Sequence, residues 1–192
     1  MRSASELRVV LPKGANYLGP ALIEIRNTDG QSASREDLFS YGSILERLTD
    51  GHPSSLASAD FNGDGRPDVA TLGQQEDAVY IAFNTGSGRL DGQARIPLGI
   101  KVGEESSLAV ADFDSDGLPD IAISDRAILI HNLGGGRFAP PVQLLPTTAA
   151  SMVNVGDFDG DGRPDVALLS PDSATGWFLR NQGAFHFAPA TP

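Results

Sequence analysis

The 192-residue sequence has no cysteine and is poor in histidine, in aromatic residues and in basic charge. The absence of cysteine excludes disulfides, thiolate metal sites and a cysteine nucleophile. No apolar run approaches the roughly 18 residues that a membrane-spanning helix needs, so we expect no membrane insertion. Lysine and arginine number 14 against 25 acidic residues, which leaves a net charge of −11. We therefore expect no nucleic-acid partner, because phosphate binding requires a basic face.

Glycine and proline, in contrast, are abundant, with 22 and 13 residues. This composition is typical of a chain that turns often, and it disfavours a helical bundle. Hydrophobic residues make up 40% of the sequence, which is enough to bury a core. The length indicates one domain or at most two small ones.

The acidic residues are concentrated in three segments of nearly the same sequence. Residues 60–68 read DFNGDGRPD, residues 112–120 read DFDSDGLPD and residues 157–165 read DFDGDGRPD. They hold 11 carboxylates, so the rest of the chain is balanced in charge. Two like charges about 4 Å apart repel by about 1 kcal/mol in water and by several times more at a protein surface. The clustering therefore predicts a counter-cation for each segment.

The residue types in these segments indicate which cation. Oxygen ligands without cysteine or histidine favour a hard ion, and a flexible loop with many oxygens favours Ca²⁺ over Mg²⁺. Side-chain oxygens fall at positions 1, 3, 5 and 9, a glycine at position 6 permits a sharp turn, and position 7 offers a backbone carbonyl. The predicted ligands of three Ca²⁺ sites are Asp60, Asn62, Asp64, Arg66 and Asp68; Asp112, Asp114, Asp116, Leu118 and Asp120; and Asp157, Asp159, Asp161, Arg163 and Asp165. The alternative is three solvated acidic turns, since these residue types favour turns in any case.

The segments do not have the pattern of EF-hand loops. An EF-hand requires a bidentate glutamate at position 12 and helices on both sides. Position 12 is occupied here by Thr71, Ile123 and Leu168, and the flanking residues alternate or run apolar, as strands do. Each segment is therefore predicted to join two strands of a hairpin.

The similarity between the segments continues beyond the acidic loops. A second apolar run follows each loop, at 78–83, 127–131 and 176–180, and ends in an asparagine and a glycine turn before a further extended segment. The acidic segments recur after 52 and then 45 residues. A period near 45 with four strands per unit is typical of a β-propeller blade. We therefore predict an all-β fold with blades of four antiparallel strands, about three of them complete and a partial one at the N-terminus.

The predicted blades divide one propeller, or a fragment of one, that spans residues 1–192. The partial blade covers 1–52, and the complete blades cover 53–104, 105–148 and 149–192. In the partial blade, residues 7–11 and 21–26 are predicted strands and 27–30 a turn, while 35–48 form either a strand or a short helix. Because the chain then begins in mid-blade, three outcomes are open: a fragment of a longer polypeptide, an arc that pairs with a second copy, or a tight four-bladed ring. We favour the fragment.

These residues resemble the FG-GAP/VCBS repeats of the integrin α-subunit type of β-propeller, over roughly residues 53–190. The resemblance implies Ca²⁺ between the first and second strands of each blade. It also implies that Phe61, Phe113 and Phe158, at position 2 of the loops, pack between blades. A secreted, cell-surface or periplasmic location follows from the same resemblance, although Met1 begins no recognisable signal peptide.

The implied function is a calcium-stabilised binding module for a protein or glycan ligand, with structural metal sites. A lectin-like propeller is one alternative, but we expect Tyr80 and Trp177 to pack in the core, and there is little other stacking surface. A non-catalytic part of a larger secreted enzyme is another. The three histidines, His52, His131 and His186, form no recognisable constellation, and neither G-x-S-x-G nor H-E-x-x-H occurs. We therefore expect no catalytic residues, and we expect His131 and His186 to be exposed on strands.

Overall fold

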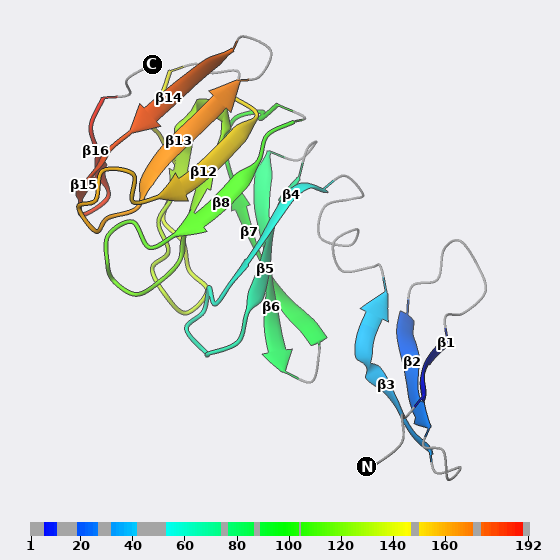
Figure 1. Ribbon diagram of the computed structural model, residues 1–192. Helices are drawn as coiled ribbons and strands as arrows, with labels where there is room; N and C mark the ends of the chain where they lie inside the picture. The colour runs from blue at the N-terminus through cyan, green and yellow to red at the C-terminus, as the bar shows by residue number, and fades with distance from the viewer. Residues whose placement is uncertain are drawn as a thin grey trace.

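A computed structural model of the chain confirms that the fold is all-β (Figure 1). It describes residues 6–10, 19–26, 32–41, 53–73, 77–86, 89–103, 105–146, 150–170 and 174–189. Within these residues the helical structure consists of one 3₁₀ turn, η1 (Asp125–Ala127). Everything else that is regular is antiparallel sheet.

The N-terminal part of the chain forms a three-stranded sheet, drawn in blue in Figure 1. Its strands β1 (Glu6–Val10), β2 (Gly19–Arg26) and β3 (Ser32–Tyr41) pair in sequence order. The helix considered for residues 35–48 is therefore wrong as far as Tyr41, where the chain is a strand. Residues 42–48 and the turn predicted at 27–30 lie outside the described residues.

Three further sheets follow, one for each acidic segment, and we call them repeats 1, 2 and 3. Repeat 1 contains β4 (Pro53–Ala59), β5 (Asp68–Gly73), β6 (Ala78–Gly86) and β7 (Arg89–Pro97). Repeat 2 contains β8 (Leu108–Ala111), β9 (Asp120–Ile123), β10 (Ile128–Ile130) and β11 (Val142–Gln143). Repeat 3 contains β12 (Met152–Gly156), β13 (Asp165–Ser170) and β14 (Thr175–Leu179), with β15 (Asn181–Gly183) and β16 (His186–Phe187) as a separate short pair.

Each acidic loop joins the first two strands of its sheet, and the same register recurs three times. The residue before the loop pairs with the aspartate that ends it, as Ala59 does with Asp68 and Ala111 with Asp120. In repeat 3, Gly156 pairs with Asp165 in the same way. Strands on both sides of each loop confirm the predicted hairpin.

The core consists of apolar layers between successive sheets. Buried residues of β5, β6 and the first loop contact buried residues of β8, β9 and β10, and the next layer joins repeats 2 and 3 in the same manner. The first strands β4, β8 and β12 are neighbours, as Figure 1 shows. Repeats 1 and 2 thus bury apolar faces against each other, and so do repeats 2 and 3, which a single four-stranded sheet cannot do alone.

Candidate metal loops

The loops at 60–68, 112–120 and 157–165, called loops 1, 2 and 3, fold around the carboxylate at their first position. In loop 1, Oδ1 of Asp60 accepts hydrogen bonds from the backbone N–H groups of Gly63 at 2.9 Å and Asp64 at 3.0 Å. Its Oδ2 accepts one from Gly65 at 2.7 Å. Asp157 makes the same three bonds in loop 3. The acidic side chain therefore holds the turn from within.

These hydrogen bonds favour the charged form of the Asp60 and Asp157 carboxylates. In Asp157 the bond from Gly162 is the largest cause, and the pKa is lowered. In Asp60 desolvation acts to raise the pKa, but the bonds from Gly65, Asp64 and Gly63 together outweigh it, and the pKa is lowered as well. Both carboxylates therefore carry the negative charge that attracts a cation.

Two positions in each loop have left-handed backbone. The glycines at position 6, predicted from the sequence, have φ between 82° and 88°. Position 4 is also left-handed, with φ of 77° at Gly63, 66° at Ser115 and 79° at Gly160. The sequence reasoning missed this second requirement, although glycine at two of the three positions was a signal for it.

Positions 3 and 5 also cap the backbone with one oxygen each. Oδ1 at position 3 accepts the N–H of position 5, and Oδ1 at position 5 accepts the N–H of position 7. Carboxylate oxygens converge within 4.8 Å of one another in two of the loops, from Asp112, Asp114 and Asp120, and from Asp157, Asp159 and Asp165. In loop 1 the amide oxygen of Asn62 stands at position 3. The donor set fits a hard divalent cation such as Ca²⁺.

The side chains at position 7 do more than the sequence indicated. Arg66 forms an ion pair with Asp64, and Arg163 forms one with Asp161. The Nε atom of Arg66 also donates to the carbonyl of Asn84 at 2.8 Å, and Arg163 reaches Asn181 in the same way at 3.0 Å. In loop 2 the residue is Leu118. Loops 1 and 3 thus contain a built-in guanidinium cation that loop 2 lacks.

The aspartate at position 9 is fully buried in all three loops. Oδ2 accepts the N–H of the phenylalanine at position 2, at 2.9 to 3.1 Å. Oδ1 accepts the N–H of the asparagine after the third strand, at 2.7 to 2.8 Å. Burial raises the pKa of Asp68, and it raises that of Asp120 to about 6. Position 9 therefore connects three segments of its own repeat, whether or not it also touches an ion.

The asparagine after the third strand continues these connections into the preceding repeat. Nδ2 of Asn132 donates to the carbonyls of Pro119 at 3.1 Å and of Phe61, in repeat 1, at 3.0 Å. Asn181 reaches Phe113 in repeat 2 at 2.8 Å. The position-9 aspartates, the position-2 phenylalanines and the asparagines after the third strands thus form one continuous series of hydrogen bonds across all three repeats. We call this series the relay; its members are Asp68, Phe61, Asn84, Asp120, Phe113, Asn132, Asp165, Phe158 and Asn181.

The phenylalanines at position 2 differ in burial although their loops match. Phe61 and Phe113 are 0% and 1% exposed, because the next repeat covers them. Phe158 is 53% exposed, and none of the described residues donates to its carbonyl. The inter-blade packing role expected for this position therefore holds for Phe61 and Phe113 and has no counterpart at Phe158.

His131 lies at loop 2 and is not the exposed strand residue that the sequence indicated. Its Nε2 is 2.8 Å from Oδ2 of Asp114 and 3.9 Å from Oδ2 of Asp116. The equivalent residue of repeat 3, Arg180, places Nε 2.8 Å from Oδ2 of Asp159. In repeat 1, where position 3 is an uncharged asparagine, the equivalent residue is Phe83. The two repeats with an aspartate at position 3 of the loop therefore have a basic residue just before the asparagine, and the repeat with an asparagine at position 3 does not. An alignment of the three repeats could have shown this correlation.

The remaining candidates are not assembled into a site. His186 is exposed on β16, as expected, and His52 lies outside the described residues. Tyr80 is buried with Arg95 over its ring, and Trp177 contacts the core between repeats 2 and 3. Both aromatic residues therefore serve packing, as expected.

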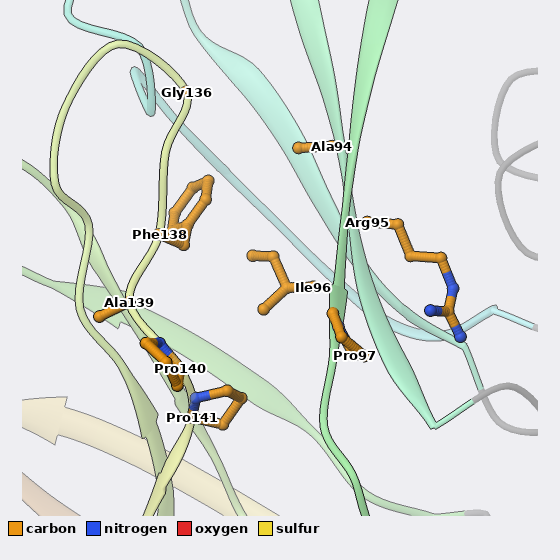
Figure 2. Close-up of a pocket in the computed structure, with 9 residues that line it drawn as sticks. All are labelled: Ala94, Arg95, Ile96, Pro97, Gly136, Phe138, Ala139, Pro140 and Pro141. Carbon is orange, nitrogen blue, oxygen red and sulfur yellow. The ribbon is translucent and has the colours of Figure 1, made fainter.

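A groove of about 350 Å³ lies between β7 and residues 136–141 of repeat 2 (Figure 2). Figure 2 shows the ring of Phe138, the side chain of Ile96 and two prolines along its walls, with Arg95 pointing away from them. The full lining is Ala94, Arg95, Ile96, Pro97, Gly136, Phe138, Ala139, Pro140 and Pro141. This apolar lining offers shape and contact area rather than acid–base chemistry.

Antiparallel blades with acidic hairpin loops, stacked face to face, define a repeat protein of the β-propeller class. The family model described as "FG-GAP-like repeat" matches residues 60–123 and 124–168. The chain therefore belongs to the FG-GAP repeat family, as its loops indicated.

The chain is also similar to parts of two known proteins. Human integrin alpha-7 is 35% identical over 129 residues, which cover 56% of this chain and 10% of that protein. A chain of the Tc holotoxin pore of Photorhabdus luminescens aligns over 99% of this chain and 9% of its own length, with 18% identity and a TM-score of 0.46. This chain thus spans about a tenth of the length of each. In its described part, no helix is long and apolar enough to cross a membrane.

Proposed function

We propose that this chain is a calcium-stabilised propeller module that binds another protein outside the cell or at its surface. The observation that carries the proposal is the position of the acidic loops: each one lies where a hairpin, a third strand and the neighbouring repeat meet. An ion held there stabilises the junctions that the relay already connects. The integrin-like relative supports the extracellular setting, where Ca²⁺ levels suit sites with dissociation constants of about 10⁻⁴–10⁻³ M.

The metal sites in this proposal are structural, and the fifteen predicted ligands divide into two kinds. Positions 1, 3 and 5 lie toward the surface, and their carboxylate or amide oxygens also accept hydrogen bonds from backbone N–H groups of the same loop. Position 9 is buried and has both oxygens in backbone hydrogen bonds. We propose a protein ligand rather than a glycan, because Tyr80 and Trp177 do not form an exposed stacking platform. The proposed role is non-catalytic.

Thermal unfolding with and without Ca²⁺ tests the stabilising role. About 10 mM Ca²⁺ is roughly 10 to 100 times these dissociation constants, so it stabilises the fold by about 1.4–2.7 kcal/mol for each site and should raise Tm by several degrees over a chelator. Asp116→Ala should reduce this gain, whereas Glu105→Ala, at an exposed position outside the loops, should not. An equal Tm in Ca²⁺ and chelator, or an equal gain in all three proteins, would contradict the proposal.

The outer face of repeat 3 is the surface that we propose for self-association. Met152, Phe158 and Leu169, each more than half exposed, lie on this sheet and its loop. The equivalent faces of repeats 1 and 2 are covered by the next repeat, which also donates an asparagine amide to the phenylalanine carbonyl. A second copy of the chain could cover this face with its repeat 1, as repeat 2 covers repeat 1 and repeat 3 covers repeat 2 within one chain. Asn84 of repeat 1 could then donate to the carbonyl of Phe158, because among the described residues its amide donates only within its own repeat.

Sedimentation equilibrium measures this association. We expect the average mass to rise with concentration up to about 1 mM, and Leu169→Glu to abolish the rise. Leu133→Glu, at an exposed leucine away from this face, is the matched control and should behave like the parent. A parent that remains monomeric throughout, or two variants that associate equally, would contradict a second copy as the occupant.

A further inference from the structure

We propose that loop 2 is a mixed nitrogen–oxygen metal site, in which Nε2 of His131 joins Asp114 and Asp116 and allows a first-row ion of the Zn²⁺ type to bind. This inference rests on the proposed metal-binding role of the loops, but it assigns loop 2 a ligand that loops 1 and 3 do not have.

The geometry brings the three ligand atoms together. One atom each of Asp114, Asp116 and His131 lies within 4.8 Å of the others, and Nε2 is 2.8 and 3.9 Å from the two carboxylate oxygens. Two ligands of one Zn²⁺ ion, at about 2.0–2.2 Å from it, are about 3–3.5 Å apart. The observed distances bracket this separation, so a small side-chain adjustment would admit the ion.

The Nε2 atom of His131 is shielded from solvent and has no hydrogen-bond partner. Although it is close to Oδ2 of Asp114, the two atoms do not meet with hydrogen-bond geometry. The imidazole ring lies against the ring of Phe185, with centroids 5.0 Å apart and planes inclined at 32°. A buried polar atom without a partner is costly. Here the atom is held by its ring contact and is aimed at two carboxylates.

The other two loops show why the histidine differs from a simple counter-ion. Arg180 contacts Asp159 in loop 3, but a guanidinium has no lone pair to donate to a metal. In repeat 1 the equivalent residue, Phe83, cannot be a ligand either. Loop 2 also lacks the position-7 arginine that pairs with the position-5 aspartate in loops 1 and 3. It therefore combines four carboxylates with the one imidazole and no guanidinium.

The mixture of donors determines which ions it prefers. Carboxylate and carbonyl oxygens suit Ca²⁺ and Mg²⁺, whereas imidazole nitrogen suits Zn²⁺ and its first-row neighbours. An imidazole added to two carboxylates raises the affinity for such ions without removing the oxygens that hold Ca²⁺. Loops 1 and 3 should remain selective for the hard ion.

Long-range ¹H–¹⁵N spectra of the histidines in the whole chain, titrated with ZnCl₂ in the presence of Ca²⁺, provide the direct test. We expect the Nε2 resonance of His131 to move with one equivalent of Zn²⁺, while that of His186 does not. Zinc affinity by calorimetry should fall at least tenfold in His131→Phe, which copies the residue of repeat 1, and should be unchanged in His186→Phe. A loss of this size is expected because substituting a residue that only hydrogen-bonds to a metal ligand already lowers metal affinity by about 10–100-fold.

The two proposals fail in different ways. A His131 resonance that does not respond to Zn²⁺, or zinc affinity that is equal in His131→Phe and the parent, would overturn the mixed site while leaving the Ca²⁺-dependent Tm intact. Loss of the Ca²⁺-dependent Tm in the parent would overturn the stabilising role instead. If His131→Phe does not fold, the response of the His131 resonance to Zn²⁺ in the parent still tests whether Nε2 binds the metal.

Discussion

Phe113 and Phe158 occupy the same place in two nearly identical loops but have opposite surroundings. Both backbone N–H groups donate to the position-9 aspartate, at 3.0 and 3.1 Å. Phe113 is nevertheless 1% exposed and Phe158 53%. The comparison separates two levels of structure: the loop motif determines local hydrogen bonding, whereas the neighbouring repeat determines burial.

The largest expected effect comes from removing the buried ring. Phe113→Ala should lower the free energy of unfolding by about 3–5 kcal/mol, because it leaves a cavity beside Phe185 and Phe187. Phe158→Ala should cost less than about 1 kcal/mol, since about half of this residue is exposed and its ring contact is with Phe178 of the same repeat. Urea unfolding of both variants in Ca²⁺ measures the difference, and equal losses would show that burial is not what distinguishes the two positions.

A second contrast concerns the asparagines of the relay. Asn132→Ala should cost about 2–3 kcal/mol, since it leaves the carbonyls of Phe61 and Pro119 without their donor. Asn84→Ala should cost about 1 kcal/mol or less, because Asn84 is only partly buried and its Nδ2 reaches only Pro67 among the described residues. Thermal unfolding compares the two variants. A larger loss in Asn84→Ala would break the proposed link between the relay and stability.

The pH dependence of the calcium-free protein contrasts positions 9 and 1. The pKa of Asp120 is raised from 3.8 to about 6 by burial, so the folded state holds this proton more tightly than the unfolded chain. Its contribution to stability is present below about pH 4 and is lost, on the order of 2 kcal/mol, as the pH rises to about 6. The pKa of Asp157 is lowered, so its contribution is present at higher pH and is lost as the pH falls through the acid range.

Urea unfolding in chelator from pH 4 to 7 measures this dependence. Asp120→Asn should flatten the fall between pH 4 and 6, while Glu105→Ala should retain the slope of the parent. An unchanged slope in Asp120→Asn would show that another group is responsible.

The smallest effect concerns position 4 of the loops. Ser115 has the left-handed backbone that Gly63 and Gly160 adopt without a side-chain penalty. Ser115→Gly should therefore raise the stability by less than about 1 kcal/mol, and Gly160→Ser should lower it by a similar amount. Differential scanning calorimetry detects shifts of this size. A loss of stability in Ser115→Gly would indicate that the serine side chain contributes more than its backbone costs.

The same separation of levels explains how far sequence reasoning could reach. The strand–loop–strand hairpins and the acidic positions were predictable, because alternation and turn chemistry act over a few residues. The exposure of Phe158 was not, since it depends on what lies beside repeat 3. The contacts of His131, Arg66 and Arg163 were missed because each side chain was read within its own segment. Their partners lie across a loop or at the end of another strand.

The relay passes through every loop, so the loops are not independent of one another. An ion that orders loop 2 also fixes Asp120, and through Asn132 it fixes the carbonyl of Phe61 and hence the backbone of loop 1. If the loops bind Ca²⁺ as proposed, uptake at one position lowers the entropic cost of uptake at the next. The module should therefore respond to calcium over a narrower concentration range than three separate sites of the same strength, with a Hill coefficient above one.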